Sequence, residues 1–301
     1  MPAMLDGAKT WFVAARPHTL SASVVPVLVG TALAARELPI SWLLFGLTLA
    51  GAVLVQIGAN LTDEVADHAA TDSALKYPAP HKVIARGLLS PAQVRLGAGV
   101  SFALATLIGL WLVMEAGWPL LAICLASLLV AYGYSAGPFP LGDYAVGEVL
   151  VFVFMGPVIV GGTAFVQSLG FGWDVLLYSL PVAALVTAIL VVNNLRDREE
   201  DAEFNRRTLV TLHGDRPARY GYLALLLIAY AAPFAAILLG LGGPLLALPW
   251  VTIPIAARVL GWVLAAEDRG TLHRALRTTS ALHLSFGLLL AIALMLDGMR
   301  G

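Results

Sequence analysis

Two clusters of acidic residues, each at the end of a long apolar segment, are the part of this sequence that could perform chemistry. They read Asn60-Leu-Thr-Asp-Glu-Val-Ala-Asp67 and Asn193-Asn-Leu-Arg-Asp-Arg-Glu-Glu-Asp201. Together with the residues just after them, they hold nine of the 19 acidic residues of the chain. A carboxylate at a membrane boundary needs water, a metal ion or a partner charge, because burying it alone is costly.

The spacing within each cluster is helical. Asn60, Glu64 and Asp67 lie at positions i, i+4 and i+7, and Asn193, Asp197 and Asp201 lie at i, i+4 and i+8. Each helix end therefore presents one amide and two carboxylates on one face. Two such faces brought together form a cage of hard oxygen donors, which suits Mg²⁺.

The composition predicts the framework that positions these clusters. The chain is 59% hydrophobic and 12% charged, with a mean hydropathy of +0.85, whereas an ordinary soluble domain has about 25% charged residues. We expect an all-α, polytopic membrane protein forming a single domain over residues 1–301. Nine apolar segments are candidates for transmembrane helices: 21–35, 41–61, 96–114, 118–134, 146–169, 175–195, 220–241, 245–266 and 279–295.

Lysine and arginine orient the predicted bundle, because basic residues in short loops stay in the cytoplasm. With the N-terminus inside, fifteen of the 18 basic residues fall on the cytoplasmic side, two (Arg36 and Arg300) fall outside, and Arg258 lies within a span. In this topology both acid clusters face the cytoplasm. We expect the protein to lie in the inner (plasma) membrane. The single cysteine, Cys124, excludes an intramolecular disulfide. The sequence has no basic stripe with interleaved aromatic residues, so it gives no indication of nucleic-acid binding.

Carboxylates beside arginines and lysines are consistent with a polyanion and its metal ions bound between them. Mg²⁺ bridges carboxylates to phosphate oxygens, while basic side chains bind the remaining oxygens. In a membrane, this chemistry suits a polyprenyl diphosphate whose tail lies among the helices. The simpler alternative is that these residues cap helices and set topology. An ion-coupled transporter predicts acids near the bilayer midplane, and a non-catalytic scaffold leaves the two Asn-acid faces unexplained.

At these residues the chain resembles the UbiA superfamily of intramembrane prenyltransferases, and within it the 1,4-dihydroxy-2-naphthoate polyprenyltransferases (MenA). The likeness covers nearly the whole chain. Besides the clusters, it is carried by Ala15-Arg-Pro-His-Thr-Leu20, Val25-Pro-Val-Leu-Val-Gly30, Tyr134-Ser-Ala-Gly-Pro-Phe-Pro140, Gly147-Glu148, Phe154-Met-Gly-Pro157 and Arg207-Thr-Leu209. Within the superfamily, prenylation of 4-hydroxybenzoate or homogentisate, haem farnesylation and chlorophyll esterification are alternatives.

The resemblance implies nine helices around a central cavity, Mg²⁺ dependence, and prenylation of dihydroxynaphthoate with loss of CO₂ and diphosphate, which gives demethylmenaquinone. One departure matters. The first family motif is commonly Asn-Asp-x-x-Asp, and here it reads Asp63-Glu64-Val-Ala-Asp67. Either Asp63 or Glu64 is then the metal ligand, and a ligand role for Glu64 predicts that Glu64→Gln is more damaging than Asp63→Asn. Asp72 is a candidate for the later acid of that motif.

We therefore predict three groups of site residues. Three acids are expected to be essential for catalysis: Asp67, Asp197 and Asp201. The expected Mg²⁺ ligands and their helpers are Asn60, Asp63, Glu64, Asp67, Asn193, Asp197 and Asp201. The candidates for contacts with the diphosphate or the aromatic ring are Arg16, Lys82, Arg86, Tyr134, Ser135, Glu148, Arg196, Arg206 and Arg207.

Overall fold

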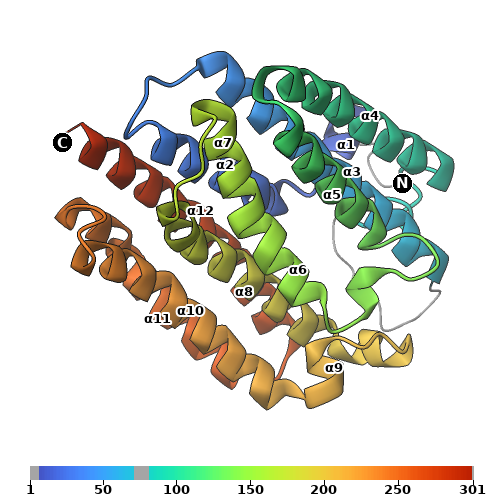
Figure 1. The fold of residues 1–301 in the computed structure, drawn as a ribbon. Helices are drawn as coiled ribbons and strands as arrows, with labels where there is room; N and C mark the ends of the chain where they lie inside the picture. The colour runs from blue at the N-terminus through green and yellow to red at the C-terminus, as the bar shows by residue number, and fades with distance from the viewer. Residues whose placement is uncertain (1–6, 71–80, 300–301) are drawn as a thin grey trace.

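The polypeptide forms a bundle of helices that run roughly alongside one another, diagonally from upper left to lower right in Figure 1. The computed structural model describes residues 7–70 and 81–299. Within these ranges there is no β-strand, so the all-α prediction is confirmed. Asp72, the candidate for the later acid of the first motif, lies outside the described residues.

The helices follow the apolar segments of the sequence. In chain order they are α1 (Gly7–Ala14), η1 (Pro17–Thr19), α2 (Ser21–Ala34), α3 (Trp42–Ala70), α4 (Pro91–Ala116), α5 (Trp118–Gly133), η2 (Leu141–Asp143), α6 (Gly147–Val153), the π-helical η3 (Phe154–Val158), α7 (Ile159–Ser168), α8 (Asp174–Glu203), α9 (Leu209–His213), α10 (Asp215–Leu238), η4 (Pro244–Thr252), α11 (Ile253–Ala265) and α12 (Arg269–Gly298).

The chain is a multi-pass membrane protein, although the predicted count of nine spans is not confirmed. Seven of the described helices are long and apolar enough to cross a membrane. An eighth span forms if α1–η1 and α2, which are bent by 59°, count together. The remaining predicted segment is α5, whose 16 residues extend about 24 Å at ~1.5 Å per residue, less than a hydrocarbon core of ~30 Å.

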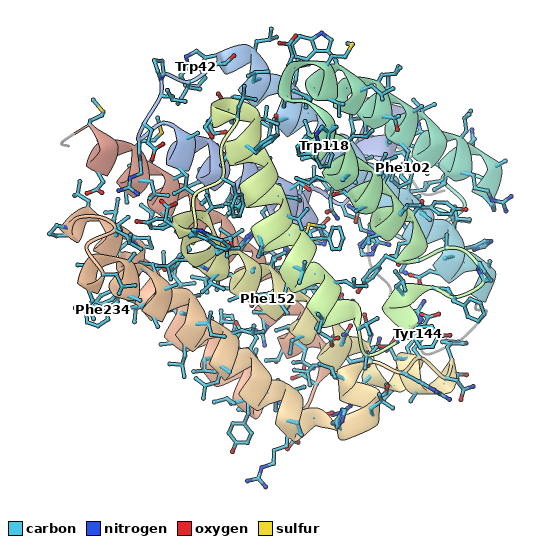
Figure 2. The ribbon with its side chains drawn as sticks, in the orientation of Figure 1. Trp42, Phe102, Trp118, Tyr144, Phe152 and Phe234 are labelled. Atoms are coloured by element: carbon cyan, nitrogen blue, oxygen red, sulfur yellow. The ribbon has the colours of Figure 1, made fainter. Side chains whose placement is uncertain are left out.

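Aromatic side chains mark the two ends of the bundle. Trp42 and Trp118, which begin α3 and α5, are exposed at one end, and Tyr144 is exposed at the other (Figure 2). Tryptophan and tyrosine favour the membrane–water interface, where an amphipathic ring meets both phases. The acid clusters lie in the last turns of α3 and α8, at the end of the bundle that carries Tyr144. We call this end the acid-cluster face.

Helix α8 is the central element that carries the second cluster into the bundle. It packs against α10, α12, α6 and η3, and Tyr178, Leu185 and Val192 on it are buried. Close packing depends on small residues. A Cβ atom at Gly156 of η3 would lie 2.3 Å from the Cβ of Ala183 on α8. Because η3 also contains Pro157, which cannot donate a backbone hydrogen bond, the π-helical turn occurs where the helix is interrupted.

Candidate active site

One large cavity connects the acid-cluster face with the apolar interior of the bundle. Its volume is about 590 Å³. At the acid-cluster face it is lined by charged and polar side chains, and at the other end by apolar residues such as Leu112, Leu120 and Val166. The cavity is therefore amphipathic, with a charged end and an apolar end. A site of this shape suits a ligand with a charged head and a hydrocarbon tail.

The first cluster presents a face that differs by one residue from the predicted one. Over the last turns of α3, the residues lining the cavity are Gln56, Ala59, Asn60, Asp63, Ala66 and Asp67. At about 100° per residue, these positions cover an arc of about 120° with Asp63 in the middle, and Glu64 lies about 40° outside it. Of the two candidate ligands Asp63 and Glu64, Asp63 is therefore the one whose side chain faces the cavity.

The side chain of Glu64 is instead buried against the segment that precedes α4, where it accepts a backbone hydrogen bond. Its side chain is 2% exposed, and its Oε1 accepts a hydrogen bond of 3.1 Å from the backbone N–H of Ile84. Its Oε2 lies 3.8 Å from Nη2 of Arg16. The sequence groups Glu64 with Asn60 and Asp67 on one helical face, but in the structure it does not line the cavity as they do. The helical spacing allows either Asp63 or Glu64 to face the cavity, and the rotation of α3 about its axis determines which of them does.

Arg16 approaches the first cluster from the segment between α1 and η1. Its Nη1 donates to Oδ2 of Asp63 at 2.6 Å. The backbone of Arg16 has φ 54° and ψ 66°, a left-handed conformation that non-glycine residues adopt at an energetic cost. The amide of Asn60 donates to the carbonyl oxygen of Ala15 at 2.9 Å and to Oγ1 of Thr19 at 3.0 Å, which holds this segment in place. Strained backbone fixed by a buried amide is typical of a functional site.

The second cluster lies on α8 and is paired with arginines. Arg196 contacts Asp197 through two atoms, with a 2.8 Å hydrogen bond from Nε, and its Nη2 donates to Oδ1 of Asn193 at 2.9 Å. Arg269 of α12 also reaches Oδ1 of Asp197 at 3.1 Å and Oε2 of Glu200 at 3.4 Å. Asp197 is therefore surrounded by two guanidinium groups.

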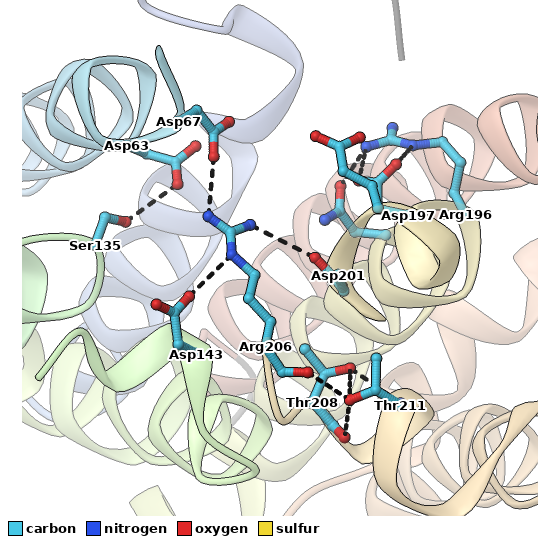
Figure 3. A network of polar contacts seen from close by, with 12 residues as sticks. Asp63, Asp67, Ser135, Asp143, Arg196, Asp197, Asp201, Arg206, Thr208 and Thr211 are labelled. Atoms are coloured by element: carbon cyan, nitrogen blue, oxygen red, sulfur yellow. Dashed lines mark hydrogen bonds and ion pairs between the residues drawn. The ribbon is translucent and has the colours of Figure 1, made fainter. Parts of the chain in front are cut away.

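Arg206 connects the two clusters (Figure 3). Its guanidinium lies 3.1 Å from Oδ1 of Asp67 on α3, 3.5 Å from Oδ1 of Asp201 on α8 and 3.0 Å from Oδ1 of Asp143 on η2. Burial alone would lower the pKa of Arg206, but the charges of Asp67, Asp143 and the neighbouring acids outweigh it and raise the pKa. Lys82 forms a further ion pair with Asp67. A positive charge is thus held where the ends of α3 and α8 meet.

The predicted basic and ring-contact residues divide into two sets. Six of them line the cavity: Arg16, Lys82, Tyr134, Ser135, Arg196 and Arg206. Ser135 donates to Oδ1 of Asp63 at 3.1 Å. Three others are not among the cavity-lining residues: Arg86, Glu148 and Arg207. Arg86 and Arg207 are exposed, and Glu148 is buried behind the wall of the cavity.

Several residues at the charged end were not predicted as site residues. Asp143, His18, His81, Asn194, Glu200 and His273 line the cavity there. Asp143 follows the Gly-Pro-Phe-Pro loop as a single acid with no repeated spacing, and burial raises its pKa while Arg206 lowers it. Asn194 adjoins a predicted ligand, so the double Asn was an available signal. The histidines have no metal-ligand spacing, and their clustering is a tertiary effect.

The donor chemistry at this end fits a hard divalent cation. The side chains that face one another across the cavity are carboxylates and amides, with oxygen atoms that Mg²⁺ prefers. Among the described residues no group of three or more His, Cys, Asp or Glu side chains is arranged as a ready metal cluster. The reason is visible in the contacts: Asp67 and Asp201 both turn to Arg206, which occupies the position between the two helices with its own positive charge.

Comparison with known proteins gives a consistent picture. A family model described as the UbiA prenyltransferase family matches residues 23–294. The chain is 31% identical to the 1,4-dihydroxy-2-naphthoate octaprenyltransferase of Bacillus subtilis, over 95% of this chain and 92% of that protein. It is 35% identical to the 1,4-dihydroxy-2-naphthoate octaprenyltransferase of Mycobacterium tuberculosis, over 94% of this chain and 96% of that protein.

Solved structures share the fold. A UbiA homolog from Aeropyrum pernix K1 matches with a TM-score of 0.70 and 17% identity, covering 91% of this chain and 97% of that chain. A UbiA homolog from Archaeoglobus fulgidus bound to GPP and Mg²⁺ matches with a TM-score of 0.66 and 15% identity, covering 93% of this chain and 99% of that chain. At these identities the likeness is one of fold.

Proposed function

This chain belongs to the UbiA prenyltransferase family, and we propose that it transfers a polyprenyl chain from a polyprenyl diphosphate to 1,4-dihydroxy-2-naphthoate. The products are diphosphate, CO₂ and demethylmenaquinol, the reduced form of demethylmenaquinone, so the step belongs to menaquinone biosynthesis. The observation that carries this proposal is the large cavity, which has a charged end and an apolar end. The names of the two bacterial relatives support the choice of acceptor. We propose that residues 1–301 act as one catalytic domain.

The diphosphate binds at the charged end in this proposal. Arg16, Lys82, Arg196 and Arg206 all line it, and guanidinium and ammonium groups are the usual partners of phosphate oxygens. Each of the four already contacts a carboxylate. Binding of the diphosphate would exchange these acid–base contacts for contacts with phosphate, so the basic side chains are held ready at the site. The exposed Arg86 and Arg207 are outside this set.

Mg²⁺ is the cofactor that the acids fit, and the Archaeoglobus neighbour bound to GPP and Mg²⁺ supports this choice. We assign it to cavity-facing oxygen donors, with Asp63 taking the place that the sequence left open between Asp63 and Glu64. The proposed ligands and helpers are Asn60, Asp63, Asp67, Asn193, Asp197 and Asp201. When bound, Mg²⁺ neutralises the diphosphate and stabilises its departure.

The apolar end holds the polyprenyl tail and limits the access of water to the reacting carbon. The bond between the allylic carbon and the diphosphate oxygen breaks, and its electron pair leaves with the diphosphate. The ring carbon that bears the carboxylate then bonds to the allylic carbon, and a ring hydroxyl gives up its proton. Loss of the carboxylate as CO₂ returns its electron pair to the ring and restores aromaticity, and the ring oxygen takes a proton back, which gives the quinol. Excluding water matters because water would otherwise capture the carbocation.

We further propose that the acid-cluster face and the N-terminus are cytoplasmic, in the inner (plasma) membrane. The support is the distribution of basic residues, fifteen of 18 on the side predicted to be cytoplasmic. Soluble dihydroxynaphthoate would then reach the charged end of the cavity from the cytoplasm, while the polyprenyl diphosphate enters from the membrane.

The test is a carbon balance with purified enzyme. Incubation with Mg²⁺, a polyprenyl diphosphate and dihydroxynaphthoate labelled in its carboxylate should release one CO₂ for each molecule prenylated. In parallel, 4-hydroxybenzoate should react little, because its carboxylate is normally retained. Efficient prenylation of 4-hydroxybenzoate without CO₂ release, together with inactivity on dihydroxynaphthoate, would move the chain to another branch of the family.

A further inference from the structure

A buried pair of polar side chains stands at the wall of the cavity beside the second acid cluster. Nδ2 of Asn194 on α8 donates a hydrogen bond of 2.9 Å to Oε1 of Glu148 on α6. Asn194 is 7% exposed and Glu148 is 6% exposed. Asn194 lines the cavity, whereas Glu148 is not among the described residues that line it. Glu148 therefore stands behind Asn194, on the side away from the ligand.

This contact sets the orientation of the Asn194 amide. A carboxylate oxygen accepts hydrogen bonds, so the NH₂ group of the amide is the half that faces Glu148. The carbonyl oxygen Oδ1 is then the half of the side chain that is left for the cavity. An amide oxygen that opens onto a binding site is available to accept a hydrogen bond from a donor on the ligand.

Tyr134 adds a hydroxyl beside this pair. A Cβ atom at Gly147, the residue before Glu148, would lie 3.0 Å from the Tyr134 hydroxyl, so that hydroxyl rests against the start of α6. Tyr134 also lines the cavity. The wall therefore offers one acceptor, from Asn194, near one hydroxyl, from Tyr134.

We propose that Oδ1 of Asn194 accepts a hydrogen bond from a ring hydroxyl of the aromatic acceptor, and that Glu148 is a positioning residue that orients this amide. The proposal rests on the proposed function and names the part of the site that selects a phenolic acceptor. Asn194 lies three residues before Asp197 on the same helix, so a ring bound there lies about one turn from the assigned diphosphate site. That proximity favours attack on the allylic carbon. Glu148 then acts through Asn194 and does not bind the acceptor itself.

The experiment is a double-mutant cycle on the full-length enzyme with both substrates varied. Asn194→Leu should raise the KM for dihydroxynaphthoate about tenfold, the effect expected for losing one buried hydrogen bond. The KM for the polyprenyl diphosphate should stay within about twofold. Glu148→Leu should also raise the acceptor KM, and the double variant should match Asn194→Leu. Glu148→Gln keeps an oxygen that accepts from Asn194 and should restore nearly wild-type kinetics.

A second buried pair provides the control. The hydroxyls of Tyr222 and Thr279 lie 3.0 Å apart in the core, and neither residue is among those described as lining the cavity. Tyr222→Phe with Thr279→Val should leave both KM values unchanged. If a single leucine variant does not fold, the double variant, which leaves no unpaired polar partner, still measures the effect.

Three results would overturn the proposal. They are an equal rise of KM for both substrates, additive effects of Asn194→Leu and Glu148→Leu, and a Glu148→Gln variant as impaired as Glu148→Leu. Each is read against a wild-type enzyme that prenylates dihydroxynaphthoate. Inactivity of the wild type on that acceptor would instead refute the proposed function, so the two failures are distinguishable.

Discussion

Asp63 and Glu64 are neighbours in the sequence with different environments, and exchanging each for its amide tests the assignment of the metal site. Asp63 faces the cavity with 31% of its side chain exposed and contacts Arg16 and Ser135. Glu64 is 2% exposed and hydrogen-bonded to the backbone of Ile84. We expect Asp63→Asn to weaken Mg²⁺ binding and Glu64→Gln to leave it nearly unchanged, the reverse of the order that a ligand role for Glu64 predicts.

The size of the difference follows from charge and position. Two unit charges 4 Å apart interact by about 4 kcal/mol at an effective dielectric constant near 20. Partial exposure of Asp63 and the nearby guanidinium of Arg16 screen part of this interaction, which leaves on the order of 1.4–2.8 kcal/mol, or a ten- to hundredfold weaker apparent affinity. In Glu64→Gln the new amide oxygen still accepts from Ile84, so the hydrogen bond persists and the Mg²⁺ midpoint should move by less than about threefold.

The assay is the initial rate of prenylation against free Mg²⁺, with both organic substrates saturating. Thermal unfolding in detergent should accompany it, to show that each variant is folded. A Glu64→Gln enzyme whose Mg²⁺ midpoint rises more than that of Asp63→Asn, with both proteins folded, would refute the reasoning from the orientation of α3. It would return the ligand role to Glu64.

Three further outcomes are expected. Three acids are predicted to be catalytic: Asp67, Asp197 and Asp201. Replacing any one of them by alanine should lower turnover by about 100-fold or more without unfolding the protein, and turnover near wild type in two folded variants would contradict the assignment of these acids to the active site. Gly30→Ala places a Cβ 2.4 Å from the carbonyl oxygen of Val160 and should lower the free energy of unfolding by about 1–3 kcal/mol, whereas Gly46→Ala, with nothing within 4 Å, should not. Burial, together with the charges of Arg16 and Lys82, lowers the pKa of His81 from 6.5 to about 2. Between about pH 6.5 and about pH 2 the unfolded chain therefore carries a proton on His81 that the folded chain does not. The folded state consequently loses stability as the pH falls below about 6.5. His81→Gln should flatten this loss of stability in unfolding measured from about pH 8 to about pH 5.

The sequence predicts the helices and the location of the acid clusters better than it predicts which side chains face one another. Apolar length and composition give the segments directly, since each helix must satisfy its own backbone in lipid. Helical spacing then identifies residues on a common face, such as Asp197 and Asp201. It does not give the rotation of that face about the helix axis. That rotation depends on packing, and for α3 it brings Asp63 to the cavity and turns Glu64 away.

The spacing of residues in the sequence does not predict contacts between segments that are far apart in the chain. Arg206 follows the second cluster in the chain, yet two of its partners are Asp67 and Asp143, which belong to other elements. Any cytoplasmic arginine satisfies the positive-inside pattern, so Arg206 and the exposed Arg207 are equivalent in the sequence. The fold separates them by exposing one and surrounding the other with carboxylates.

The balance of charge in the cavity supports the proposed metal dependence with an argument that does not rely on any single ligand. Six acids line the described part of the cavity, namely Asp63, Asp67, Asp143, Asp197, Glu200 and Asp201, against four bases, namely Arg16, Lys82, Arg196 and Arg206. With every group in its usual ionised form, the lining carries two more negative charges than positive ones. A diphosphate adds further negative charge in a partly desolvated site, where like charges repel strongly. Arg269, which contacts Asp197 and Glu200 but is not among the lining residues, reduces the excess of the lining to one negative charge. The bases then still do not offset both sets of anions, which favours the proposed entry of divalent cations together with the diphosphate.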